Sequence, residues 1–135
     1  MSVIKSKRST SDAQFLNTAR ELESKTRRAC LRCPKRYTFY GLQELWQTSR
    51  RVYSNVKKAN SINPKNSHEF QIRKDLFIQA MIELQDYVSQ LEIMTEDGIF
   101  TPAAESTLPE VVDKEIKLIK GVMKSDRARY QGLLE

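Results

Sequence analysis

The chain has 135 residues, of which 39% are hydrophobic and 30% are charged, and its formal net charge is +6. One domain is expected at this length, and no apolar run approaches the roughly 20 residues that a membrane-spanning helix needs. No apolar stretch follows the basic residues 1–11. We therefore expect no secretory signal, no membrane partner and a cytoplasmic location.

The basic residues are concentrated in the first half of the chain. Residues 1–60 contain 14 Lys or Arg and four Asp or Glu, a balance of +10, whereas residues 61–135 contain nine against thirteen, a balance of −4. Because acids are so few in the first half, pairing within it leaves most of the positive charge unneutralised. Such a surface favours a polyanionic partner, above all nucleic acid.

The first two predicted helices follow residues 1–11, which we expect to form a flexible basic arm. Apolar residues repeat every three or four positions and Gly and Pro are rare, which predicts an all-α chain. The first helix should run from Asp12, its expected cap, to residue 33, because Pro34 ends it. The second should span residues 38–59. Its expected inner face consists of Phe39, Leu42, Leu45, Trp46, Val52, Tyr53 and Val56.

The third predicted helix opens with a capping box, since Glu69 follows Asn66 at the required spacing. It should run to about residue 95 and bury one long apolar stripe. A second apolar line falls on its far side at 100° per residue. This second line consists of Ile78, Ile82 and Ile93. We expect it to form an oligomer interface; the alternative is that it only broadens the core face.

The fourth predicted helix follows a loop over residues 96–106. Thr107 and Glu110 predict a second capping box, and the helix should end near residue 129. Its expected inner face consists of Val112, Ile116, Ile119 and Met123, and the opposite sector holds Lys114, Lys117, Lys120, Lys124 and Arg127. Four helices of similar length with short connections predict an antiparallel up-down four-helix bundle over residues 12–131.

Cys30 and Cys33 form a C-x-x-C pair at the end of the first predicted helix. A reactive pair usually opens a helix, where the helix dipole favours the thiolate. A zinc site would need two further ligands, and His68 is the only histidine. We expect both cysteines to pack as small apolar residues, with metal binding and redox chemistry as the alternatives.

Residues suited to catalysis are scarce. His68 should lie exposed at the start of the third helix, and Asp75, Glu83 and Asp86 have no fixed ligand spacing. No Gly-rich phosphate loop is evident either. We therefore expect no catalytic residue, no metal and no cofactor, and a protein that is not an enzyme.

Rows of basic residues fall on single helix faces. Lys25, Arg28 and Arg32 follow an i, i+3, i+7 line, and Lys57 lies two helical turns beyond Arg50. Such rows can contact successive phosphates with little sequence preference. The alternative is that these side chains are solvated or paired with acids. The predicted nucleic-acid-binding residues are Lys25, Arg28, Arg32, Lys35, Arg36, Arg50, Arg51, Lys57, Lys58 and Arg73.

Arg73 is unusual within this set because it falls inside the apolar sector of the third predicted helix. Burying an unpaired guanidinium costs several kcal/mol. We expect Arg73 to extend out of the end of the bundle, so that its charge reaches water. A buried ion pair, or a contact with a second subunit or with RNA, is the alternative.

Three short segments resemble a known bacterial family. They are Cys33-Pro34-Lys35-Arg36-Tyr37-Thr38-Phe39, Val56-Lys57-Lys58-Ala59-Asn60 and, after Leu84, Val88-Ser89-Gln90-Leu91. Over residues 12–129 the chain resembles small four-helix-bundle proteins. That group includes the accessory variability determinants of diversity-generating retroelements and their relatives encoded in ribosomal RNA intervening sequences.

This resemblance implies a non-enzymatic homopentamer that binds nucleic acid through basic surfaces. It also implies a reverse transcriptase partner, which the protein would assist while template RNA is copied into cDNA during mutagenic retrohoming. RNA and RNA–DNA hybrid are the expected ligands. The alternative is an intervening-sequence-type structural or RNA-binding bundle with no reverse transcriptase partner.

Overall fold

The computed structural model describes residues 13–100 and 102–133, and for residues 102–106 it describes the backbone alone. All regular structure in these ranges is helical, which confirms the all-α prediction for this part of the chain. The expected basic arm and the expected cap at Asp12 lie outside the described residues. No described helix is both long enough and apolar enough to cross a membrane.

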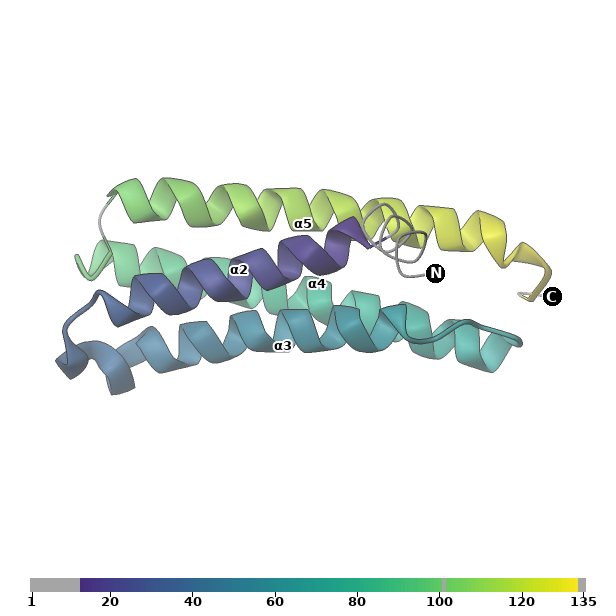
Figure 1. Cartoon of the computed structure of the whole chain (residues 1–135), viewed down its shortest axis with the longest axis horizontal. Coiled ribbons are helices and arrows are strands. Elements are labelled where there is room, and N and C mark those ends of the chain that lie inside the picture. The colour runs from purple at the N-terminus through teal and green to yellow at the C-terminus, as the bar shows by residue number, and fades with distance from the viewer. Residues whose placement is uncertain (1–12, 101, 134–135) are drawn as a thin grey trace, which may run out of the picture.

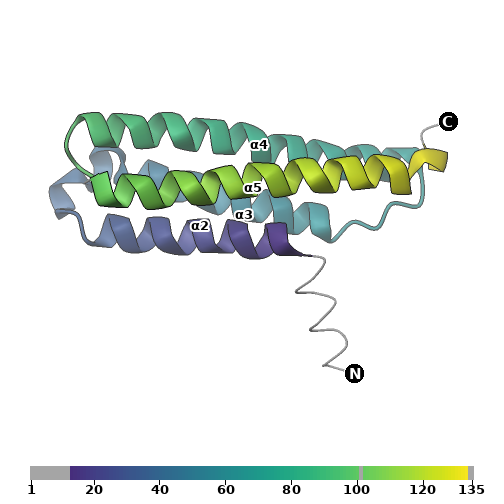
Figure 2. The same ribbon diagram turned by 90° about the horizontal axis from the view of Figure 1, so that it is seen from above.

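Four long helices lie side by side along the long axis of the molecule (Figures 1 and 2). They are α2 (Gln14–Leu31), α3 (Gln43–Asn60), α4 (Ser67–Glu96) and α5 (Pro102–Arg129). α2 packs against α3 and α5, and α4 packs against the same two helices. The contacts thus close a ring in which the α2–α3 side and the α4–α5 side face in opposite directions.

The core between the helices consists of the apolar residues that the sequence periodicity identifies. Leu22 of α2, Val52 of α3, Phe77 and Leu84 of α4 and Ile119 of α5 are fully buried. Removing this much apolar surface from water is the main force that holds helices of this kind together. The apolar stripes that the helical period predicts are therefore confirmed in outline.

Phe39 is a clear exception, because 91% of its surface is exposed. The connection between α2 and α3 consists of a 3₁₀ turn, Lys35–Tyr37, and a π-helical turn, Thr38–Leu42. A π turn contains more residues than an α turn, so the register of residues before it shifts relative to α3. The prediction that Phe39 belongs to the inner face is wrong for this reason.

The start of α4 confirms the predicted cap. The side-chain oxygen of Asn66 accepts a hydrogen bond of 2.9 Å from the backbone N–H of Glu69. The Glu69 carboxylate accepts one of 2.8 Å from the N–H of Lys65, one residue before the position that a standard capping box uses. The backbone N–H of Glu69, in the first turn of α4, and that of Lys65, just before the helix, are both satisfied in this way.

The predicted start of the fourth helix is wrong, because α5 begins at Pro102 rather than after Thr107. Proline is favoured in the first turn, where its missing N–H would have no helical partner and its φ is already helical. Gly98, with φ of 75°, provides the turn that separates α4 from α5. Pro109 is accommodated inside α5.

Arg73 is buried, with 7% of its surface exposed, so the prediction that it extends out of the bundle is wrong. Its Nε donates to Asp126 Oδ2 at 2.7 Å and its Nη2 to Asp126 Oδ1 at 3.2 Å. Its Nη1 donates to the carbonyl oxygens of Ala59 and Ile62, at 2.9 and 3.0 Å. The buried ion pair thus joins α4 to α5 and also caps the end of α3.

Cys30 and Cys33 pack against the core, as expected for small apolar residues. Both are free thiols. The Cys30 thiol donates to the carbonyl oxygen of Leu42 at 3.6 Å, and that of Cys33 to the carbonyl oxygen of Ala29 at 3.4 Å. Burial, with a smaller contribution from the charge of Cys33, raises the pKa of Cys30 to about 12. Cys30 is therefore a thiol rather than a reactive thiolate at neutral pH.

Glu115 is a buried acid that the sequence analysis did not single out. It is fully buried within the described part of the chain, and neither carboxyl oxygen has a hydrogen-bond partner there. Burial raises the pKa of this carboxyl to about 9, and Lys114 opposes the shift only in part. Glu115 is therefore protonated in the folded protein at neutral pH.

Candidate nucleic-acid interface

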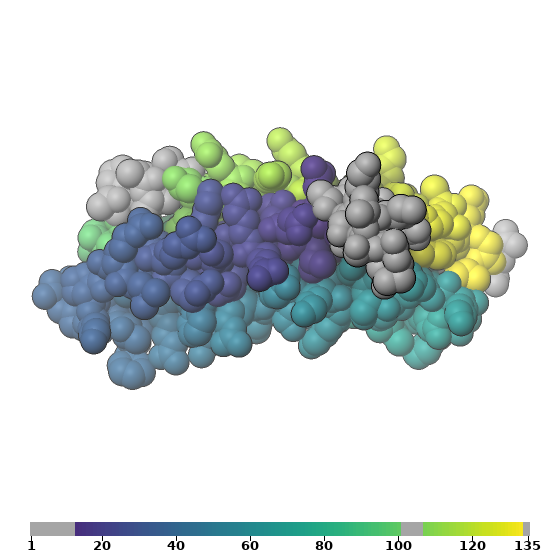
Figure 3. Space-filling model, in the orientation of Figure 1, coloured from purple at the N-terminus to yellow at the C-terminus, as the bar shows by residue number. Residues whose placement is uncertain are grey.

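An open groove of about 840 Å³ runs between α2 and α3. Figure 3 shows the side of the molecule on which α2 lies in front, with its side chains in purple and blue. One acid, two serines, two aromatic rings and four cations line the groove. Its residues are Glu23, Arg27, Trp46, Arg50, Tyr53, Ser54, Lys57, Lys58 and Ser61.

Aromatic and basic residues alternate along the α3 side of this groove. Trp46, Arg50, Tyr53 and Lys57 are spaced by four, three and four residues, so the helix places all four on one face. The Arg50 guanidinium lies 5.0 Å from the centre of the Trp46 ring, and the Lys57 ammonium 5.7 Å from that of Tyr53. Each cation therefore lies over a ring face.

The Trp46 ring is held in place from the α2 side. Its Nε1–H donates to Glu23 Oε2 at 2.8 Å, and the same oxygen accepts a bond of 3.2 Å from Arg27 Nε. Glu23 is therefore neutralised by Arg27 while it orients the indole. The result is a fixed ring in a groove whose remaining charges are positive.

Seven of the predicted nucleic-acid-binding residues are exposed and form no ion pair with another described residue. They are Arg28, Arg32, Lys35, Arg36, Arg50, Lys57 and Lys58. The last three line the groove, and the other four lie around the turn that joins α2 to α3. The structure thus extends the basic surface from the groove to that end of the molecule.

Two other predicted residues, the half-buried Lys25 and the exposed Arg51, are paired with acids. The Lys25 ammonium lies 3.0 Å from Glu21. The Arg51 guanidinium lies 3.2 Å from Glu83 of α4 and 3.6 Å from Glu44. Exposed pairs of this kind contribute at most about 1 kcal/mol to stability and can open when a phosphate competes. They add less to the basic surface than an unpaired side chain does.

Arg73 does not belong to this surface. Its buried guanidinium is occupied by Asp126 and by the end of α3. Its inclusion among the predicted nucleic-acid contacts is therefore wrong. The aromatic partners of the groove, by contrast, were missed as site residues, although the seven-residue spacing of Trp46 and Tyr53 matches that of Arg50 and Lys57.

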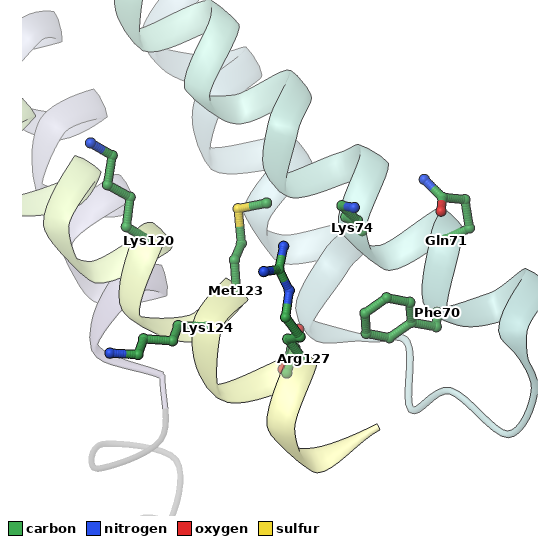
Figure 4. Close-up of a pocket in the computed structure, with 8 residues that line it drawn as sticks. Phe70, Gln71, Lys74, Lys120, Met123, Lys124 and Arg127 are labelled. Carbon is green, nitrogen blue, oxygen red and sulfur yellow. The ribbon is translucent and has the colours of Figure 1, made fainter. Parts of the chain in front are cut away.

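A second basic pocket, of about 310 Å³, lies between α4 and α5. Phe70, Gln71 and Lys74 reach it from α4, and Met123 and Arg127 from α5 (Figure 4). It is completed by Lys120, Lys124 and Asp126. Because Asp126 is paired with Arg73, it offsets little of the positive charge of the rim. This pocket lies on the side opposite the α2–α3 groove.

His68 is exposed at the start of α4. In the part of the chain that the structure describes, no three His, Cys, Asp or Glu side chains come together as a metal site would require. No protein-family model and no curated protein matches the chain. The groove between α2 and α3 is therefore the candidate functional site.

Proposed function

We propose that the protein binds RNA through the groove between α2 and α3 and is not an enzyme. The observation that carries this proposal is the alternation of Trp46, Arg50, Tyr53 and Lys57 on one face of α3. Interleaved cations and partly exposed rings are the two components by which proteins hold nucleic acid without reading its sequence. An RNA–DNA hybrid presents the same phosphates, so it is a second expected ligand.

The groove can supply several phosphate contacts at once. Arg50, Lys57 and Lys58 form no ion pair with other described residues, and all three line the groove. Each phosphate neutralised releases counterions, so binding should weaken steeply as salt rises. Since no element of the groove reads base edges in a fixed pattern, we expect little sequence preference.

A charge-reversal experiment tests this proposal. The variant Arg50→Glu/Lys57→Glu should lose RNA binding at about 0.1 M salt, where the Debye length is about 10 Å. The matched control is Lys114→Glu/Lys117→Glu, which changes the charge equally on exposed positions of α5. Both variants should keep the helical content of the parent. Equal RNA affinity in the two variants would contradict the proposal.

The narrower function that we propose is that of an accessory protein of a diversity-generating retroelement. In this role an antiparallel up-down four-helix bundle would bind template RNA or cDNA and the element's reverse transcriptase, and thereby support mutagenic retrohoming. Its support is the resemblance carried by segments such as Val56-Lys57-Lys58-Ala59-Asn60. Co-purification with a reverse transcriptase from the native host would test this role, and its absence there would favour the alternative. The alternative remains an intervening-sequence-type bundle without that partner.

We also propose that the protein forms a homo-oligomer through the outer face of α4. Ile78, Ile82 and Ile93 are 38, 54 and 50% exposed, and Ile72, which is 40% exposed, extends the same line. At 100° per residue these four positions fall within about 120° of one another. An apolar face of this kind is typical of a contact surface. A homopentamer is the state that the resemblance implies.

A further inference from the structure

The aromatic rings of the α2–α3 groove are placed where phosphate binding alone would not require them. Trp46 and Tyr53 are only partly buried and both line the open groove, and Tyr53 also packs against the core. Cations alone would be sufficient to hold a backbone of phosphates. The rings therefore indicate a ligand that offers flat apolar surfaces as well as charge.

The two rings are far enough apart to hold two different bases of one strand. Trp46 and Tyr53 are seven residues apart, which corresponds to about 10.5 Å along a helix. Bases stacked directly on one another lie about 3.4 Å apart, so bases held against the two rings belong to separate nucleotides that no longer stack on each other. One strand lying along α3 can thus place a base against each ring.

The cations over the rings can leave the ring faces when such a strand binds. The Arg50 and Lys57 charges lie 5.0 and 5.7 Å from the ring centres in the ligand-free protein. Both side chains are exposed, where cation–ring attraction is weak. An arriving base can replace each cation on the ring face, and the displaced cation can then pair with the adjacent phosphate.

We propose that the groove prefers a single-stranded polynucleotide and binds it by stacking bases on Trp46 and Tyr53. This inference rests on the proposed RNA-binding function and names the form of its ligand. In a duplex the bases are stacked on one another and paired, so only phosphates would reach the groove. In a single strand the base faces are accessible to aromatic side chains.

Trp46 is the only tryptophan of the chain, so its fluorescence reports on the groove directly. We expect single-stranded RNA and single-stranded DNA oligonucleotides to quench it, because stacking does not read the 2′-hydroxyl. Duplex RNA of the same length and at the same salt should leave it largely unchanged. Quenching of equal depth and equal affinity by the duplex would overturn the inference.

Ring variants provide the second arm of the test. Tyr53→Leu should weaken single-strand binding about tenfold, within the range measured for loss of one base–aromatic stack, and leave duplex binding unchanged. Tyr53→Phe keeps the ring and should bind as the parent does, which separates stacking from loss of the fold. The matched control is Tyr130→Leu, which removes a tyrosine that contacts Phe70 away from the groove.

The outcomes distinguish this inference from the function on which it rests. If Arg50→Glu/Lys57→Glu abolishes binding but Tyr53→Leu has no effect on the single strand, the preference for single strands is refuted and RNA binding stands. If the parent protein binds neither single strand nor duplex, both are refuted.

Discussion

The buried carboxyl of Glu115 predicts a stability that falls as pH rises. In the folded state burial raises its pKa to about 9, whereas the unfolded chain has the ordinary value of 4.5. Below pH 4.5 the carboxyl is protonated in both states, so it adds no pH dependence. Between about 4.5 and 9 the unfolded state loses the proton while the folded state keeps it. Rising pH therefore favours unfolding through this window.

The size of the effect follows from linkage. Each pH unit within the window removes up to about 1.4 kcal/mol from the free energy of unfolding. At pH 7.5, three units above the ordinary value, the loss amounts to about 4 kcal/mol. This is a large part of the 5–15 kcal/mol that typically stabilises a domain.

The variant Glu115→Gln replaces the titrating carboxyl with an amide that does not ionise, and it keeps the shape of the side chain. We expect its free energy of unfolding to equal that of the parent near pH 4.5 and to exceed it increasingly up to pH 9. Urea denaturation followed by circular dichroism at three pH values measures this difference. The control is Glu110→Gln, an exposed position of the same helix. Parallel pH profiles of the parent and Glu115→Gln would refute the reasoning.

Three further predictions concern the ion pair, the cysteines and the outer face of α4. Asp126→Asn should cost about 3–5 kcal/mol because it leaves Arg73 buried without its partner; thermal denaturation that shows a loss below 1 kcal/mol would contradict this. The variant Cys30→Ala/Cys33→Ala should retain RNA binding, and its free energy of unfolding should fall by at most a few kcal/mol. Stoichiometric zinc in the parent protein that is lost from this variant would show a metal role instead. Light scattering should give about five times the chain mass of 15.7 kDa, and Ile82→Asp should give the monomer; a monomeric parent at tens of micromolar would exclude the oligomer.

The sequence was sufficient to predict those features that depend on local chemistry. The cap at Asn66 needs only its spacing from Glu69, and the buried stripes need only a helical period. The exposure of Phe39 was not predictable, because a π turn leaves no periodic signature in so short a segment. The early start of α5 is not evident from the sequence, because a proline such as Pro102 is as typical of a loop as of the first turn of a helix.

The candidate site was predicted in part. The cations of the groove were identified from their charge and spacing, but which of them are paired depends on contacts between helices, as between Arg51 and Glu83. Arg73 was correctly seen as anomalous, yet Asp126 lies 53 residues further along the chain, so its partner could not be identified. Glu115 lies between Val112 and Ile119 on the inner face of α5, and that position alone could have marked it as buried.

The salt dependence of RNA affinity tests the central claim most directly. For a single strand, the slope of log K against log salt is about −0.7 per phosphate contacted. Neutralising two contacts in Arg50→Gln/Lys57→Gln should therefore flatten the slope by about 1.4. The control Lys114→Gln/Lys117→Gln should keep the slope of the parent. Equal slopes in all three proteins would contradict the assignment of the α2–α3 groove as the RNA-binding surface.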